Sequence, residues 1–66
     1  MRYQIKLRCL QLGIKQRELM LKVTERTGEA IDPPFFSSAV SGALRTPKAE
    51  RVLAAADEIL TEMEGK

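Results

Sequence analysis

Histidine and tryptophan are absent from this 66-residue chain, and cysteine occurs once, as Cys9. A single cysteine cannot form a disulfide within the chain, and without histidine it cannot complete a tetrahedral zinc site. The lack of histidine also excludes the Ser-His-Asp and Cys-His arrangements of nucleophilic enzymes. The four glycines lie too far apart to form a glycine-rich phosphate loop. We therefore expect no enzymatic activity, no metal and no cofactor.

Long apolar runs are missing as well. No run approaches the roughly 18 apolar residues that a membrane span requires, and the N-terminus lacks the hydrophobic region of a secretory signal. These absences predict a cytoplasmic protein that binds no membrane and no small-molecule substrate. In such a reducing compartment, Cys9 is expected to be a small, buried core residue.

The length allows one small domain, which we place at residues 1–66. Aromatic residues make up only 5% of the chain, so the core must be built mainly from aliphatic side chains. Neither a disulfide nor a metal is available to stabilise so small a core. Helix packing or self-association must therefore supply the stability that these would give.

Glycine and proline divide the chain into four segments with helical patterns. Gly13, Gly28 and Gly42 each follow an apolar stripe, a position where glycine commonly ends a helix. Asp32 and Thr46 each precede a proline, an arrangement that commonly starts one. No segment alternates with the period of two that a strand requires. The sequence therefore predicts an all-α fold of four to five short helices around one core, with helices at 2–12, 16–27, 33–41 and 47–64.

Each predicted helix has one apolar face, which we expect to point into the core. The pattern is longest in 47–64, where it continues over about four turns. The residues expected to point inward are Ile5, Cys9 and Leu12 with Leu10 beside them, then Leu19, Met20 and Val23, then Phe36, Ala39 and Val40, and finally Val52, Ala56, Ile59, Leu60 and Met63.

The formal net charge is only +2, but the charges are unevenly distributed. Residues 1–31 contain seven basic and three acidic residues, whereas residues 32–66 contain four basic and six acidic residues. Residues 1–17 contain five basic residues and no acidic one. This asymmetry indicates one side that faces a polyanion and an acidic tail in solvent, although an ordinary helical surface would also be consistent with it.

Two short helices joined by a glycine-containing connector, with one helix before and one after them, are typical of a DNA-binding helix-turn-helix. Three segments carry a resemblance to one family: Leu-Gly-Ile-Lys-Gln-Arg-Glu-Leu at 12–19, Phe-Ser-Ser-Ala-Val-Ser-Gly at 36–42 and Thr-Pro-Lys-Ala-Glu-Arg-Val at 46–52. These segments resemble the start of the second helix, the end of the recognition helix and the following helix of Cro/cI-type (Xre-like, lambda-repressor-like) regulators. The resemblance covers residues 5–60.

The resemblance implies a sequence-specific, repressor-like transcription regulator of phage or prophage type, which binds double-stranded DNA as a homodimer. The second helix would run over about 16–27, and the recognition helix, about 33–41, would enter the major groove. Gln16 would contact a phosphate at the start of the second helix, with help from the helix dipole. Lys15 and Arg17 beside it would supply positive charge.

Beyond the recognition helix, Arg45 and Lys48 would contact the flanking DNA backbone. Lys48 is expected in the first turn of a helix, where the dipole disfavours a cation, and an approaching anion would explain it. The alternative for both residues is an ordinary charged loop. Gln16 and Arg17 could likewise be solvated residues of a first helical turn.

The chain departs from the family pattern at several positions. Lys15 stands where the family usually has Thr or Ser, so the usual N-cap is lost, at a cost of about 1 kcal/mol. The connector between the second and third helices is longer than the compact family turn. Residues 32–42 contain no Arg, Lys, Asn or Gln, the side chains that read bases through paired hydrogen bonds. The outward candidates in the recognition helix are Pro34, Phe35, Ser37, Ser38 and Ser41.

Two classes of function remain open. The first is the DNA-binding regulator, in which the serines contact base edges or the groove and Phe35 contacts thymine methyl groups. The second is a helical protein-interaction module, such as an anti-repressor or adaptor, built on a helix-turn-helix scaffold. In this second class, Phe35 and Pro34 would be an apolar anchor for a protein partner. Salt-dependent binding to duplex DNA separates the two.

Overall fold

The computed structural model describes residues 4–65, which form four helices and contain no strand. The helices are α1 (Ile5–Leu12), α2 (Gln16–Thr27), α3 (Pro33–Ser41) and α4 (Pro47–Glu64). The predicted all-α class and the predicted bounds of the last three helices are confirmed. The first helix begins at Ile5 rather than at residue 2, and residues 2 and 3 lie outside the described part.

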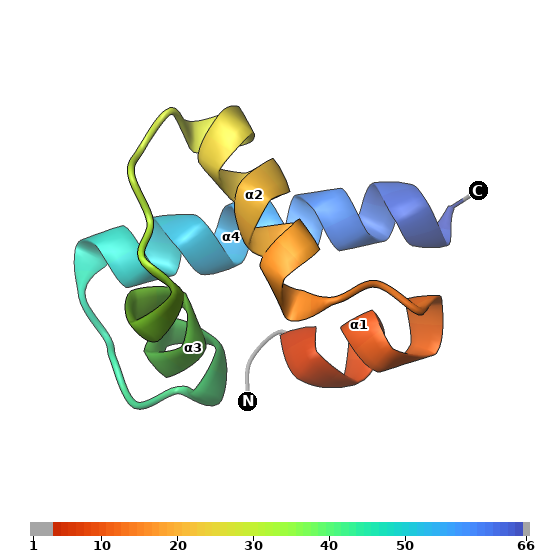
Figure 1. The fold of residues 1–66 in the computed structure, drawn as a ribbon, viewed down its shortest axis with the longest axis horizontal. Coiled ribbons are helices and arrows are strands. Elements are labelled where there is room, and N and C mark those ends of the chain that lie inside the picture. Colours follow the sequence, from red (N-terminus) through yellow and green to blue (C-terminus); the bar gives the residue numbers. More distant parts are fainter. Residues whose placement is uncertain (1–3, 66) are drawn as a thin grey trace.

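The longest helix, α4, packs against each of the other three (Figure 1). It runs along the long direction of the molecule, α2 crosses in front of it, and α1 and α3 lie on the lower side. The start of α2 therefore lies between α1 and α3. This arrangement brings α3 to the same side of the molecule as α1 and the start of α2, although the length of α2 separates them in sequence.

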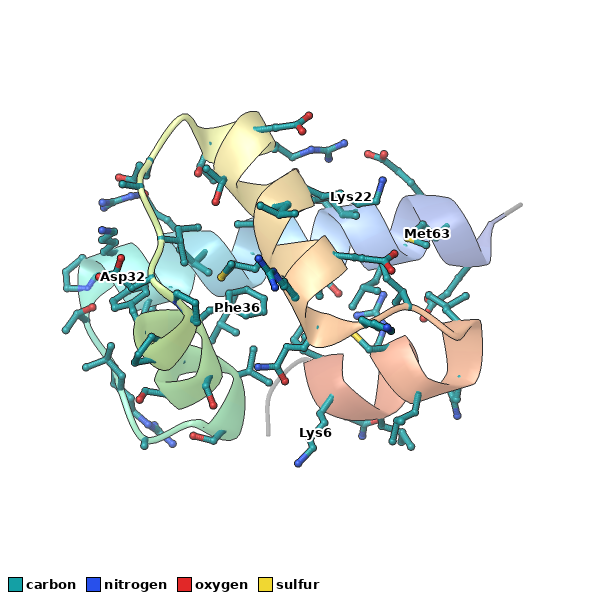
Figure 2. The ribbon with its side chains drawn as sticks, viewed as in Figure 1. Lys6, Lys22, Asp32, Phe36 and Met63 are labelled. Atoms are coloured by element: carbon teal, nitrogen blue, oxygen red, sulfur yellow. The ribbon has the colours of Figure 1, made fainter. Side chains whose placement is uncertain are left out.

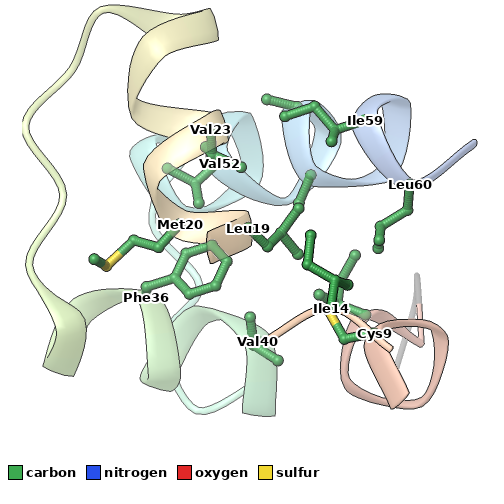
Figure 3. Packing of buried hydrophobic residues seen from close by; sticks show 13 residues of the cluster. Cys9, Ile14, Leu19, Met20, Val23, Phe36, Val40, Val52, Ile59 and Leu60 are labelled. Atoms are coloured by element: carbon green, nitrogen blue, oxygen red, sulfur yellow. The ribbon is translucent and has the colours of Figure 1, made fainter. Parts of the chain in front are cut away.

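The predicted apolar faces meet in a single core (Figure 3). Phe36 lies beside Leu19 and Val52 in its centre, and Cys9 lies beside Ile14 at one end. Ile14, in the short link between α1 and α2, is buried although no helical pattern indicated it. Met63 and Leu12 are only half-buried at the edge of the core. The fully buried larger side chains are Phe36, Ile5, Leu19, Leu60, Val23 and Val52.

The prediction for Leu10 is wrong, because its side chain is 74% exposed. Leu10 lies about 100° around α1 from Cys9, and α1 buries only the narrow face that carries Ile5 and Cys9, so Leu10 falls outside it. Burial of Cys9 is confirmed, and that burial raises the pKa of its thiol. The thiol is therefore kept neutral inside the core, as a structural cysteine would be.

The helix starts differ in how they are capped. The Thr46 hydroxyl accepts a hydrogen bond from the Ala49 amide at 3.1 Å, as its position before Pro47 predicts. Asp32 occupies the N-cap position of α3, but its side chain makes no capping hydrogen bond. Pro34, the second residue of α3, removes one of the two backbone N–H groups that an N-cap side chain binds, and only that of Phe35 remains. Lys15 also leaves the start of α2 without a side-chain cap.

Two arginines bind the acidic residues of α4. Arg8 of α1 donates to Asp57 and Glu64, the latter at 2.8 Å, and also to the Thr61 hydroxyl at 3.0 Å. Its side chain is only 15% exposed. The hydrogen bond from Arg8 lowers the pKa of the Glu64 carboxyl below its ordinary value.

The second arginine, Arg26 of α2, donates two hydrogen bonds to Glu62, at 2.8 and 2.9 Å, and one to Glu58 at 3.4 Å. The acidic end of α4 is exposed, as expected, with the side chains of Glu58 and Glu62 65% and 58% exposed, but it is not without partners. The carboxylates at the end of α4 are paired with α1 and α2.

Substitution Leu60→Ala tests the closure of the core by α4. Leu60 is fully buried, so its truncation leaves a cavity and is expected to reduce the free energy of unfolding by about 2–5 kcal/mol. That loss is enough to unfold much of so small a domain. Urea denaturation followed by circular dichroism measures it, with Leu10→Ala as the exposed control. An unchanged midpoint for Leu60→Ala would contradict the packing described above.

Acidification tests the hydrogen bonds of Arg8. Because the pKa of Glu64 is lowered in the folded state, this pairing stabilises the fold fully above the ordinary glutamate value of 4.5 and is lost as the pH falls below it. The stability difference between the wild type and Arg8→Gln should therefore shrink between pH 6 and pH 3. Urea denaturation at both pH values measures it. A difference that stays constant would show that Glu64 is not paired with Arg8 in solution.

Candidate nucleic-acid interface

The pair α2 and α3 has the order of a helix-turn-helix, with residues 28–32 as the connector. The connector begins at Gly28, which adopts a positive φ of 72° and ends α2. The connector has five residues, and α2 continues through Thr27 as predicted. Two cations of α4 hold it in place. Lys48 Nζ donates to the Ala30 carbonyl at 2.9 Å, and Arg51 forms an ion pair with Glu29 at 2.9 Å.

Lys48 and Phe35 lie together at the first turns of α4 and α3. The Lys48 ammonium sits 5.0 Å from the centre of the Phe35 ring, in a cation–π contact. Phe35 itself is half-buried and packs against the core, so it is less exposed than the sequence suggested. The position of Lys48 in a first helical turn thus has an explanation within the chain and does not require an external anion.

The start of α2 presents the three residues that the resemblance assigns to the DNA backbone. Lys15 and Arg17 are exposed, and Gln16 is half-buried between them. Gln16 lines two open hollows on the surface. The first, here called the α1–α2 hollow, has a volume of about 440 Å³ and is also lined by Lys6, Leu10 and Lys15. The second, the α2–α3 hollow, has about 450 Å³ and is also lined by Arg17, Leu21, Pro33 and Phe36.

The outward face of α3 carries short side chains. Pro34, Ser37 and Ser41 are exposed, whereas Ser38 is half-buried. The Ser41 hydroxyl donates to the Ser38 carbonyl at 3.0 Å, so it is already bonded to its own helix. Ser37 is left as the exposed hydroxyl in the middle of the helix.

Arg45 lies in the loop that follows α3. It is exposed and lines a hollow of about 180 Å³ together with Ser41, Gly42 and Glu50. It therefore neighbours the end of α3, whereas Lys48 lies at the connector. Of the two cations predicted to contact flanking DNA, the structure brings Arg45 beside α3, the predicted recognition helix, and binds Lys48 to Ala30.

Pairing divides the cations of residues 4–65 into two groups. Arg8, Arg26 and Arg51 form ion pairs with acidic residues. Six further cations in this part of the chain form none: Lys6, Lys15, Arg17, Lys22, Arg45 and Lys48, the last of which instead donates to the Ala30 carbonyl. Glu18, Glu25 and Asp32 are acidic residues without an ion pair in the same range, and the first and last lie at the starts of α2 and α3. The residual charge around the start of α2 is positive.

Lys6 is a further candidate for a nucleic-acid contact, which the sequence alone did not single out. It projects from the lower edge of the molecule, whereas Lys22 lies on the upper side near Met63 (Figure 2). It lines the α1–α2 hollow with Lys15, nine residues later in the chain. The excess of basic residues in 1–17 was the available signal, but the distinction between paired Arg8 and unpaired Lys6 depends on contacts that only the fold creates.

Other kinds of site are not found in the described part of the chain. Between residues 4 and 65 no group of His, Cys, Asp and Glu side chains is arranged to hold a metal ion. The same residues include no helix with the length and apolar character needed to cross a membrane.

No known protein-family model, curated protein or solved structure matches this chain. The lambda-repressor-like resemblance of residues 5–60 therefore stays a prediction.

The role of Lys48 at the connector can be measured by substitution. Lys48→Gln removes the cation–π contact and the charged hydrogen bond to Ala30, and we expect the free energy of unfolding to fall by about 1 kcal/mol. Lys22→Gln removes a lysine without an ion pair and should leave the free energy of unfolding unchanged. Thermal unfolding of the two variants measures the difference. Equal stability of Lys48→Gln and the wild type would show that the contacts of Lys48 with Phe35 and Ala30 do not stabilise the fold.

Proposed function

We propose that this chain is a helix-turn-helix transcription regulator that binds duplex DNA through the start of α2 and the outward face of α3. One observation carries the proposal. Ion pairs with Arg8 and Arg26 occupy the acidic end of α4, while Lys15 and Arg17 remain unpaired beside Gln16 on the helix-turn-helix. The charge asymmetry of the sequence thus becomes a cationic area at the position where a helix-turn-helix meets DNA.

The start of α2 is suited to a phosphate oxygen. The first N–H groups of a helix have no partner within the helix, and the Lys15 side chain does not cap them. A phosphate placed there would accept hydrogen bonds from these N–H groups, and the positive end of the helix dipole would stabilise its negative charge. The Gln16 amide and the Lys15 and Arg17 side chains would add hydrogen bonds and charge. Such contacts position the protein on DNA and are insensitive to base sequence.

The outward face of α3 supports only modest direct reading of bases. Ser37 can hydrogen-bond several bases, and Pro34 can touch a thymine methyl group, but neither makes the paired contacts of Arg, Asn or Gln. The half-buried Phe35 can reach the groove only with its exposed edge. We infer that most of the affinity for DNA comes from contacts to the DNA backbone. Arg45 adds a contact beside the end of α3.

The regulator is proposed to act as a homodimer of repressor-like character. A single module of this size makes few base contacts, and a two-fold pair places the same contacts on two half-sites. Doubling the number of phosphate contacts also strengthens binding, because each contact releases counterions.

A second candidate function is a protein-interaction module, which the exposed leucines favour. Leu7 and Leu21 are 49% and 53% exposed on the outer faces of α1 and α2. Apolar side chains at such positions can anchor a partner protein. Binding of that kind would depend little on salt.

A titration on mixed-sequence duplex DNA at several salt concentrations tests the proposal. Neutralisation of Z phosphates gives a slope of log K against log salt near −0.9Z, and we expect Z of about 3–5 per subunit. Fluorescence anisotropy of labelled DNA measures it. Undetectable binding at low salt, or binding without a salt slope, would favour the protein-interaction module.

Arg17→Ala tests the backbone contact itself. We expect it to weaken binding to all sequences about equally and to flatten the slope by about one unit. Lys22→Ala is the matched control, since it removes an unpaired cation of the same helix on the upper side of the molecule and should leave the slope unchanged. If Arg17→Ala changed the sequence preference instead, Arg17 would be a base contact.

A further inference from the structure

The α1–α2 hollow combines features that neither the core nor the helix-turn-helix explains. Leu10 lines it and is 74% exposed, more than Leu7 or Leu21, the other large exposed apolar residues of the described chain. Lys6 and Lys15 line it from two different elements, and neither forms an ion pair in residues 4–65. Ile14 contributes to its apolar lining, and no acidic residue lines it.

These features match the two parts of a sugar–phosphate step. Lysine is a flexible point charge that binds phosphate without a fixed geometry, and two lysines from separate elements can neutralise neighbouring phosphates. The deoxyribose between two phosphates presents carbon atoms, for which an exposed leucine side chain is a suitable contact. A hollow with an apolar lining, whose charged residues are all cations, is therefore complementary to a DNA strand along its backbone.

Continuity with the start of α2 indicates which strand would lie there. Gln16 lines both the α1–α2 hollow and the α2–α3 hollow. A strand whose phosphate is held at Gln16 would therefore continue directly into the α1–α2 hollow. Figure 2 shows Lys6 projecting on that same lower side of the molecule.

We propose that the α1–α2 hollow binds the sugar–phosphate step next to the one held by Gln16, with Lys6 and Lys15 on the phosphates and Leu10 against the sugar. The proposal rests on the proposed DNA-binding function and extends its contact area to α1. It makes Lys6 and Leu10 binding residues, although Leu10 was expected to belong to the core.

The experiment compares Lys6→Gln with Lys22→Gln in the salt titration on mixed-sequence duplex DNA. Lys6→Gln should flatten the slope by about 0.9, as expected for the loss of one phosphate contact, whereas Lys22→Gln should keep the wild-type slope. Both lysines are exposed on helices and form no ion pair within residues 4–65. Thermal unfolding of both variants should match the wild type.

A second pair of variants tests the sugar contact. Leu10→Ser should weaken binding about threefold to tenfold at every salt concentration while the slope stays unchanged, because an apolar contact releases no counterions. Leu7→Ser removes another exposed leucine of α1, outside the hollow, and should bind as the wild type does.

The possible failures are distinguishable. Wild-type slopes and affinities for Lys6→Gln and Leu10→Ser, together with a flattened slope for Arg17→Ala, would overturn the role of the α1–α2 hollow and leave the proposed function standing. Absence of salt-dependent binding by the wild type would overturn the proposed function itself. If Leu10→Ser instead altered only the sedimentation of the free protein, the hollow would be a contact between copies of the chain, and the proposal would be wrong.

Discussion

Burial of the apolar face of α4 is the constraint on which the rest of this structure depends. Each of the other helices packs against α4, and Val52, Ala56 and Leu60 are fully enclosed along it. A chain of this size has little apolar surface to bury, and its single cysteine forms no disulfide within the chain to add to it. The positions of α2 and α3, and so the geometry of the proposed helix-turn-helix, follow from how each lies on α4.

Charge pairing on the same helix determines which cations remain available. Arg8 and Arg26 reach α4 from different helices, and their carboxylate partners lie in its second half. At the other end of α4, Lys48 and Arg51 bind the connector between α2 and α3. α4 therefore serves as the ionic partner of α1, α2 and the connector. The cations without such a partner at the start of α2 form the proposed contact area.

Local signals in the sequence allow the helices to be predicted, whereas contacts between residues that are distant in sequence could not be predicted. Proline after Asp32 or Thr46 and glycine after each stripe act on their own neighbours, so the bounds of α2, α3 and α4 could be read directly. The partners of Arg8 lie about fifty residues away, and nothing near Arg8 indicates them. Lys48 and Ala30 meet only after the chain has folded, so Lys48 looked like a free cation. The proposed contact of Gln16 with DNA rests on the resemblance, and that of Lys15 and Arg17 rests also on their exposure.

The two faces of α3 are independent of each other. Phe36, Ala39 and Val40 attach the helix to the core, whereas Pro34 and Ser37 on the outside make no hydrogen bond to other elements of the described chain. Replacement of Ser37 by a longer polar residue would therefore alter what the helix touches without changing how it packs. The outward face of α3 can thus change in evolution without loss of folding stability. The same separation makes this face a surface whose residues can be redesigned while the core is kept.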